Sequence, residues 1–199
     1  MKTSFAWLAV GATLFAAGYV VAQQTAAPTV RRVVTKLDES AKAVVMVDER
    51  VPLSNVRPPN YVANMWVTGK SLPDLSFSAD RAKTKTGLTP PKGGTVFRIV
   101  DFAPEPESVA HMDMNTMMRV VGAEAPKKGL PPRHPMMHRT RTLDYAVIMA
   151  GEIDMLLDEG EVHLKAGDVV VQQATNHAWV NRGAAPCRVA FILMDSQEP

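Results

Sequence analysis

The sequence has few of the features that would narrow its function at once. Cysteine occurs once in 199 residues, so no disulfide can form within the chain. Cys187 stands beside the apolar run at residues 189–194, which predicts a buried, inert thiol rather than a nucleophile or a metal ligand. An excess of one charge is missing too. The formal net charge is +2, and basic residues occur in pairs rather than patches, so nothing favours nucleic acid as a partner.

Several catalytic signatures are also missing. The sequence contains no Ser/His/Asp order, no Gly-rich phosphate loop and no zinc-finger spacing. Sustained helical patterns are few, and fifteen prolines favour β structure and irregular segments. From residue 138 onward apolar and polar residues alternate, with a predicted hairpin turn at residues 158–161. Many short strands at even spacing indicate an all-β sandwich or barrel.

The first 22 residues have the composition of a targeting segment. Lys2 is the only charge before Arg31, residues 5–21 are almost wholly apolar, and Val20 and Ala22 offer compact side chains at the −3 and −1 positions. These features predict a signal peptide at residues 1–22, and with it a periplasmic or secreted protein that does not contact a membrane after cleavage. The alternative is an uncleaved membrane anchor, for which this apolar run is short.

The rest of the chain divides into two parts. Residues 23–95 are predicted to form a strand-rich N-terminal arm packed on the main domain, and residues 96–199 the main domain itself. Within the latter, residues 107–135 form a predicted insertion rich in methionine and proline, and half of the chain's twelve methionines fall between Met112 and Met137. A helix from Ser108 to Val121 that packs on the barrel is predicted there. A lid beside a pocket is the alternative.

Two histidines and one carboxylate are the candidate site residues. His138 and Thr140 share a face, because residues two apart in a strand point the same way. Asp144 lies six residues beyond His138, which is roughly 20 Å along a straight strand. The sequence therefore predicts a turn or kink within residues 139–143 that returns Asp144 on the neighbouring strand. His177 follows a further predicted strand and can reach the same space.

The strand after the predicted kink has two apolar faces. Ala146 and Ile148 share the face of Asp144 and suit the inside of a narrow barrel. The opposite face is predicted to be covered by the arm or by a second subunit; it carries Tyr145, Val147 and Met149.

Three further residues are predicted to bind a substrate: Trp179, Ile148 and Asn181. Core packing is the alternative for Trp179, which shares the side of His177. The remaining polar candidates are predicted to lie elsewhere. Arg139 and Arg141 are interpreted as surface arginines, because their parity with His138 turns them away. His163 is predicted to be exposed, and His134 is too far from His138 to share a metal unless the chain folds at Pro135.

The spacing of the site residues resembles the two signature motifs of the cupin superfamily. The first is similar to G-x5-H-x-H-x3/4-E-x6-G, and His138-x-Thr140-x3-Asp144-x6-Gly151 keeps its spacing. The second is similar to G-x5-P-x-G-x2-H-x3-N, and Gly167, His177 and Asn181 match it with the first gap one residue shorter. The resemblance covers roughly residues 94–196 and looks like a poorly characterised group of single-domain cupins. It implies a jelly-roll β-barrel (a double-stranded β-helix) and, as in many cupins, a homodimer.

Departures from the motifs bear on metal binding. Thr140 stands where most metal-binding cupins have their second histidine, and Asp144 replaces the usual glutamate. Ala174 stands where the turn glycine is expected; a positive φ would strain it, so a different turn is predicted. The remaining set, His138, Asp144 and His177, suits a divalent iron, manganese, nickel or zinc ion, with Thr140 as a possible weak ligand. The alternative is a metal-free barrel in which these residues bind a ligand or each other.

The resemblance favours an enzyme but no single reaction. The prediction is an exported, metal-dependent enzyme acting on a small organic molecule, with oxygenase, decarboxylase, isomerase or lyase chemistry. The alternative is a non-catalytic periplasmic cupin that binds a small molecule without metal.

Overall fold

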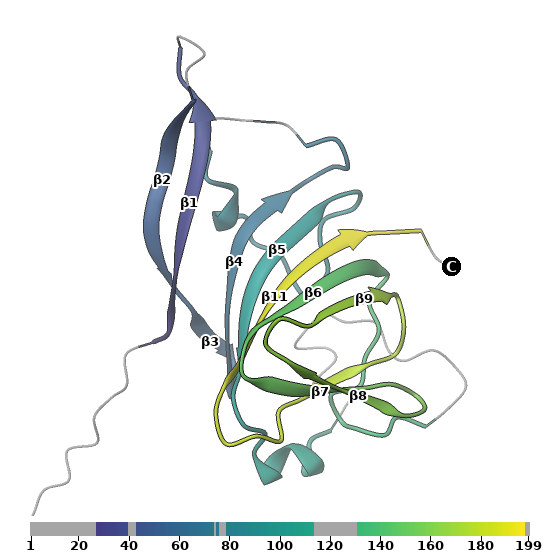
Figure 1. Ribbon diagram of the computed structural model, residues 1–199. Coiled ribbons are helices and arrows are strands. Elements are labelled where there is room, and N and C mark those ends of the chain that lie inside the picture. Colours follow the sequence, from purple (N-terminus) through teal and green to yellow (C-terminus); the bar gives the residue numbers. More distant parts are fainter. Residues whose placement is uncertain (1–26, 40–42, 74, 76–78, 114–130, 198–199) are drawn as a thin grey trace, which may run out of the picture.

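The computed structural model describes residues 27–39, 43–73, 75, 79–113 and 131–197. Within them the chain forms antiparallel strands and short turns, as the alternating pattern predicts (Figure 1). The strands are β1 (Thr29–Leu37), β2 (Ala43–Pro52), β3 (Ser54–Arg57), β4 (Asn60–Thr68), β5 (Thr95–Phe102), β6 (Thr142–Ala150), β7 (Glu152–Leu156), β8 (Glu161–Lys165), β9 (Val169–Gln173), β10 (Ala178–Val180) and β11 (Cys187–Asp195). Two 3-10 turns are η1 (Arg81–Lys83) and η2 (Glu107–His111).

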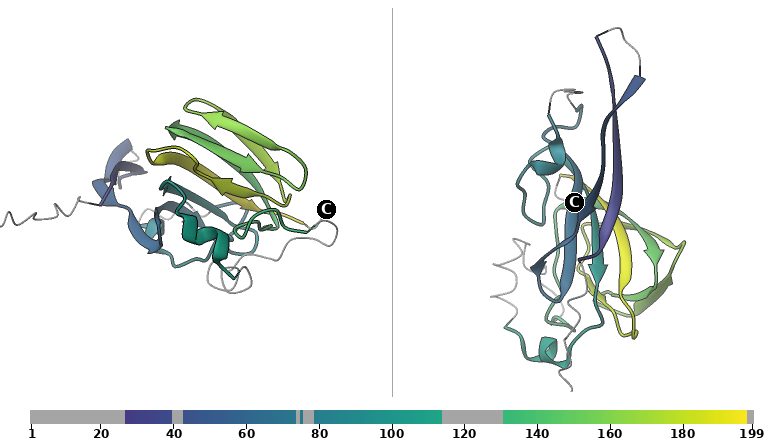
Figure 2. Two further views of the ribbon diagram at one scale, coloured as in Figure 1. Left: turned by 90° about the horizontal axis from the view of Figure 1, so that it is seen from below. Right: turned by 90° about the vertical axis from the view of Figure 1, so that its left-hand side faces the viewer.

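Two sheets pack face to face around the core. The larger has the strand order β3-β4-β5-β11-β6-β9 and the smaller the order β10-β7-β8. Ala146 and Val189 of the larger sheet share one buried apolar cluster with Ile153 and Leu164 of the smaller. The β1–β2 hairpin forms a third, two-stranded sheet beside the larger one and extends past it (Figures 1 and 2). The predicted all-β jelly-roll barrel is confirmed.

Strand β6 has one apolar face inside the barrel and one apolar face outside it. Ala146 and Ile148 are each 1% exposed, and they point into the barrel. The odd-numbered residues point outward and are 38% to 48% exposed; they are Tyr145, Val147 and Met149. The predicted apolar outer face is therefore present, but the arm does not cover it here.

Gly151 allows the tight connection between β6 and β7. Its φ is +77°, a conformation that is costly for residues with a Cβ. A Cβ at this position would lie 2.8 Å from the carbonyl oxygen of Pro186 and 3.0 Å from Cα of Cys187. The turn is thus closed against the start of β11 in a way that only glycine fits.

The structure revises two predicted boundaries. Strands β3 and β4, predicted as part of the arm, pair into the larger sheet, since β4 runs beside β5 over its length. The predicted helix from Ser108 to Val121 is wrong where it is described. Only η2 forms, no side chain caps it, and Met112 already has extended backbone angles.

Two predictions fall on other parts of the chain. The signal peptide at residues 1–22 and residues 114–130 of the predicted insertion lie outside the described residues. Among the residues that the structure describes, no helix is long and apolar enough to span a membrane.

Candidate functional site

His138 and His177 meet across an isolated antiparallel bridge. Each backbone N–H donates to the carbonyl of the other residue, and both N–O distances are 2.9 Å. The imidazole rings lie side by side, with centroids 4.6 Å apart. The sequence prediction that these two histidines converge is met by this backbone pairing.

Backbone carbonyls hold one nitrogen of each imidazole. Nδ1 of His138 lies 2.8 Å from the carbonyl oxygen of Met136, and Nδ1 of His177 lies 3.0 Å from that of Thr175. The Gln172 amide also lies 3.1 Å from Nδ1 of His177. Protonation of each Nδ1 satisfies these carbonyls and makes Nε2 the acceptor nitrogen.

Burial keeps His177 neutral. The side chain is buried, and desolvation, reinforced by the nearby His138, lowers the pKa of His177 from 6.5 to about 3. Burial penalises the charged form of an imidazole, which must give up its hydration. At neutral pH this side of the site is therefore an uncharged hydrogen-bonding group.

Asp144 presents a buried carboxyl to the same space. It is 5% exposed, and its Oδ1 atom is buried without a hydrogen-bond partner. Desolvation raises the pKa of Asp144 from 3.8 to about 6, against smaller opposing effects of a hydrogen bond from Thr142 and the charge of Arg98. A carboxyl of this kind changes its protonation state near physiological pH.

The chain bends between the histidine and the carboxylate but does not double back. A bend falls at Arg141, inside the predicted 139–143 interval. Asp144 then continues along β6, paired with Gln172 of β9 and Leu193 of β11. The predicted return of Asp144 on a neighbouring strand is therefore wrong. Thr140 and Thr142 lie between the two groups, with their hydroxyl oxygens 2.7 Å apart.

The three predicted metal ligands do not gather into one cluster. Within the described residues, no group of three His, Cys, Asp or Glu side chains is placed to hold a metal ion. The paired imidazoles satisfy part of the expected geometry, but the carboxylate lies farther along the strand. The residues therefore do not fit a three-ligand centre in this arrangement.

A cavity of about 150 Å³ connects these groups. Its polar lining residues are Asn60, Arg98, Glu105, His138, Thr140, Asp144, His177 and Asn181. Most of the wall is apolar, including Val62, Val100, Phe102, Trp179, Phe191 and Leu193. Trp179 packs edge-on against Phe191, with ring centroids 5.4 Å apart. A mostly apolar cavity with a few converging polar groups is typical of a small-molecule site.

The predicted substrate-binding residues are divided by the structure. Trp179 and Asn181 line the cavity. Asn181 also bonds to the carbonyls of Phe102 and Ala185, which fixes its amide. Ile148 is not among the lining residues; it is 1% exposed and belongs to the core cluster. The prediction that Ile148 contacts a substrate is wrong. Ile148 shares the inward face of β6 with Asp144, but the cavity ends before Ile148, which packs in the apolar core.

Arg98 is a lining residue that the sequence did not single out. Its side chain is 3% exposed, and Nη2 donates to the carbonyl of Gly87 at 2.9 Å. It lies in β5 on the inward face, between Phe97 and Ile99, which point outward. The inward parity of a charged residue in an apolar strand was the signal available for it.

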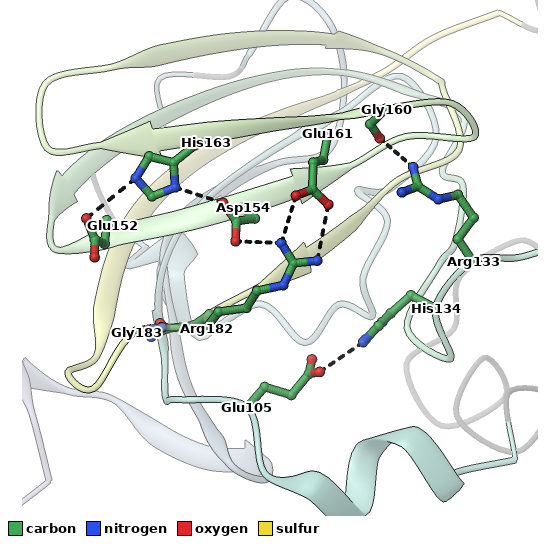
Figure 3. Close-up of polar contacts among 11 residues, drawn as sticks. Glu105, Arg133, His134, Glu152, Asp154, Gly160, Glu161, His163, Arg182 and Gly183 are labelled. Atoms are coloured by element: carbon green, nitrogen blue, oxygen red, sulfur yellow. Dashed lines mark hydrogen bonds and ion pairs between the residues drawn. The ribbon is translucent and has the colours of Figure 1, made fainter.

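A second polar pair, Glu105 and His134, also went unpredicted (Figure 3). Nε2 of His134 lies 3.0 Å from Oε1 of Glu105, and Nδ1 of His134 accepts the backbone N–H of Met136 at 3.1 Å. That acceptor role leaves the proton on Nε2, so His134 donates to the carboxylate. Glu105 lines the cavity, and no local sequence pattern links residues so far apart.

The other polar candidates lie off the cavity. His163 is exposed, as predicted, and joins Asp154, Glu152 and the Arg182–Glu161 ion pair on the surface (Figure 3). The surface interpretation of Arg139 is wrong, because the residue is 4% exposed and its Nε donates to the carbonyl of Ala174.

The fold and the cavity define a small jelly-roll protein with a mostly apolar cavity inside the barrel. A family model for the cupin domain matches residues 124–193. Phomopsin biosynthesis cluster protein C' of Diaporthe leptostromiformis is 32% identical over 178 residues, which cover 85% of this chain and 80% of the relative. The cupin-domain-containing oxidoreductase srdD of Neurospora crassa is 30% identical and covers 91% of this chain and 84% of its own. The chain belongs to the cupin family.

One solved structure is a more distant likeness. The cupin 2 conserved barrel domain protein from Salinispora arenicola is 12% identical, with a TM-score of 0.39, and the match covers 74% of this chain and 89% of that one.

The comparisons also correct the predicted location. The relatives named above are fungal biosynthesis-cluster and cupin-domain oxidoreductase proteins, so the prediction of a periplasmic or secreted protein is wrong. It rested on the composition of residues 1–22 alone, and an apolar run with compact residues after it is not unique to exported chains.

Proposed function

We propose that this cupin is an enzyme that binds a small, largely apolar organic molecule and transfers a proton at Asp144. The observation that carries the proposal is a buried carboxyl, 5% exposed, whose Oδ1 has no protein partner while the residue lines the cavity. A buried acceptor without a partner costs free energy, so a ligand that donates a hydrogen bond there would be stabilised. Relatives named cupin-domain oxidoreductases support an enzyme rather than a passive carrier.

The surrounding charges suit the start of such a reaction. The carboxyl has a pKa of about 6, which places a general acid or base near the working pH. Arg98 adds a permanent positive charge to the same wall, and a fixed charge of this kind stabilises negative charge that develops on a bound molecule. Loss of a proton next to a carbonyl creates such a charge. Isomerases and lyases that act next to a carbonyl group use this proton loss, and a decarboxylase needs the reverse step, in which the carbon that has lost CO2 gains a proton.

The cavity lining sets the kind of molecule. Val62, Val100, Phe191 and the ring of Trp179 supply apolar contact. Neutral His177, together with His138, can accept a hydrogen bond from a hydroxyl group of the bound molecule at Nε2. A compact ring or short chain with one or two oxygens matches a cavity of about 150 Å³.

The imidazole pair favours a second candidate, a divalent ion. Metal-binding histidines usually hold their second nitrogen on a carbonyl or carboxylate, and both Nδ1 atoms here lie within 3.0 Å of carbonyls. Such an ion would polarise a bound oxygen atom. It would have only the two imidazoles as clustered ligands, so no reaction step is assigned to it.

Proton transfer can be tested without the natural substrate. A panel of small cyclic ketones and β-keto acids is incubated in deuterated water, and exchange of the hydrogens next to the carbonyl is followed by proton NMR. Asp144→Asn keeps the shape of the side chain and should slow exchange by about 10²- to 10⁴-fold, the usual worth of a general base. Glu159→Gln removes a carboxylate from the exposed β7–β8 turn and is the matched control. Equal rates for wild type and Asp144→Asn would refute the proposal.

Elemental analysis tests the second candidate. Stoichiometric metal in the wild type that is lost in both His138→Ala and His177→Ala would support it. Retention of metal in both variants would place the ion elsewhere.

A further inference from the structure

Arg98 is a buried, permanently charged side chain on the wall of the cavity. It is 3% exposed, and it lines the cavity together with Val100 and Phe102 of the same strand, β5. Its Nη2 donates to the carbonyl of Gly87 at 2.9 Å, which helps to orient the guanidinium. An arginine keeps its charge at any physiological pH, and burial removes most of the water that would otherwise stabilise that charge. A ligand with a negative charge is therefore favoured at this part of the wall.

Strand register brings Arg98 and Asp144 to the same region of the cavity. Arg98 faces Phe191 across the β5–β11 ladder, and Asp144 faces Leu193 across the β6–β11 ladder. Phe191 and Leu193 are two residues apart on β11, and both line the cavity, so all four side chains share the inward face. Two strand spacings and one same-face step put the Cα atoms of Arg98 and Asp144 about 12 Å apart. A short molecule that lies over Phe191 and Leu193 can contact both polar groups.

The two polar groups are near each other, but they do not cancel each other. Desolvation raises the pKa of Asp144 to about 6, and the charge of Arg98 opposes this rise only in part. The hydrogen bond that also lowers this pKa comes from Thr142, and Oδ1 of Asp144 has no hydrogen-bond partner. Arg98 and Asp144 therefore act on a ligand as separate groups, one as a fixed positive charge and the other as a carboxyl group that can take up a proton.

We propose that Arg98 binds a carboxylate group of the substrate, a contact here called the carboxylate site, so that the substrate is a small carboxylic acid with an apolar skeleton. The inference rests on the proposed proton transfer at Asp144, because it names the class of molecule that the same cavity takes. A guanidinium and a carboxylate form short, charge-assisted hydrogen bonds, and their planar shapes match. One guanidinium balances one negative charge, whereas a phosphate group would bring nearly two into a mostly apolar cavity.

The carboxylate site determines which carbon of the substrate can react. With the carboxylate at Arg98, the part of the molecule at Asp144 is the end away from the carboxylate. An oxo group between the two ends would acidify the C–H bonds there. When such a C–H bond breaks, its proton passes to the Asp144 carboxylate, and its electron pair moves onto the oxo oxygen to form an enolate. The substrate class is therefore a short 2-oxo or 3-oxo acid that reacts at the carbon beyond its oxo group.

Matched pairs of acids and amides test the carboxylate site without any turnover. Butanoate, 3-methylbutanoate and 2-oxopentanoate are titrated into the protein at pH 7.5 beside their amides, and ligand-observed NMR and calorimetry give each Kd. An amide keeps the shape of the acid but carries no charge. The wild type should bind each acid more tightly than its amide by about tenfold or more, as expected for a hydrogen bond between charged groups. Equal affinity for acid and amide, or acids that do not bind at millimolar concentration, would overturn the proposal.

Two substitutions in the same cavity should change acid binding in opposite directions. Arg98→Met removes the positive charge and should abolish the preference for the acid over its amide, whereas Arg98→Lys keeps the charge without the planar fork and should keep part of the preference. Asp144→Asn removes a negative charge near the bound acid and should tighten acid binding by about threefold or more, with little effect on the amide. Arg182→Met removes an arginine whose side chain is 50% exposed on the surface, and this control should match the wild type.

Thermal melts check that each variant is folded, and Arg98→Lys with Asp144→Asn keeps the test decisive if Arg98→Met does not fold. A preference for acids that persists without the arginine, or acid binding that Asp144→Asn weakens, would refute the carboxylate site.

Deuterium exchange separates this inference from proton transfer itself. If Asp144→Asn slows exchange but neutral ketones exchange as fast as oxo acids of the same length, proton transfer holds and the carboxylate site fails. If the preference for acids depends on Arg98 but Asp144→Asn does not slow exchange, the carboxylate site holds and proton transfer at Asp144 fails.

Discussion

The backbones of His138 and His177 hold each other, through two reciprocal hydrogen bonds of 2.9 Å. The proximity of their rings, 4.6 Å between centroids, therefore follows from strand pairing and needs no metal to maintain it. Replacement of one imidazole should leave the other in place, since the bonds that align them are backbone bonds. The site is in this sense preorganised by the fold.

The pH dependence of stability should reveal the buried carboxyl. The pKa of Asp144 is raised from 3.8 to about 6, so between these values the native state keeps a proton that the unfolded state has lost. The contribution of Asp144 to the free energy of unfolding is therefore largest at low pH. It falls by on the order of 3 kcal/mol as the pH rises from about 4 through 6. Asp144→Asn cannot ionise and should lack this decline. Urea unfolding from pH 4 to pH 7 measures the difference between the two proteins; a constant difference would contradict the raised pKa. Glu159→Gln, on the surface, should follow the wild type.

His177 should make the stability of the protein depend on pH in the opposite direction. Its pKa is lowered from 6.5 to about 3, so the unfolded state takes up a proton before the native state does. The stability from this group is complete above pH 6.5 and is lost as pH falls towards 3. His177→Gln should unfold less steeply with acid than the wild type over that range. Acid titrations followed by tryptophan fluorescence test this, and an unchanged acid midpoint would count against a buried neutral imidazole.

Two glycines at the ends of β-strands should differ in tolerance. Gly151 and Gly160 both have positive φ, +77° and +75°, so alanine at either costs roughly 1–2 kcal/mol. Only at Gly151 does the new Cβ collide with backbone atoms, at 2.8 Å and 3.0 Å. Gly151→Ala should therefore lose about 1–3 kcal/mol more than Gly160→Ala, the usual cost of overpacking. Thermal melts of the two variants measure this difference. An equal loss of stability in both would show that the backbone at the start of β11 moves at little cost to make room for the new Cβ.

The single thiol should be inert in the folded protein. Burial, with smaller contributions from Asp101 and Glu152, raises the pKa of Cys187 to about 11, and the thiolate is the reactive form. A disulfide reagent such as DTNB should label Cys187 at pH 8 only after denaturant is added. Fast labelling of native protein would mean that β11 opens locally.

Much of the barrel follows directly from the sequence. Strand β5, Thr95–Phe102, has glycines just before it and a proline soon after it, and these local signals mark its limits in the sequence. The buried and exposed faces of β6 could be predicted as well, because side chains alternate between the two faces of a strand whatever lies around it. The convergence of His138 and His177 followed from motif spacing.

Long-range pairing explains the failures. Ala174 does adopt a positive φ, +50°, although the sequence argued against it. Its N–H donates to Thr142 and its carbonyl accepts from Arg139, both at 3.0 Å. These partners, more than thirty residues away in the sequence, offset the strain and bury Arg139. Glu105 and His134 meet in the same non-local way, 29 positions apart.

The cavity wall has two origins, and they differ in how freely they can change. Arg98, Asp144 and Phe191 come from paired strands, whereas Pro58, Ala103 and Val109 lie between strands. Connecting segments tolerate substitution and insertion better than the elements they join. Related barrels can thus change the compound that they accept through changes in the segments between strands. The polar groups on the paired strands keep their positions, because backbone hydrogen bonds between the strands hold them. A mutant library confined to the connectors should shift substrate preference with little loss of folding, which makes this division useful for engineering.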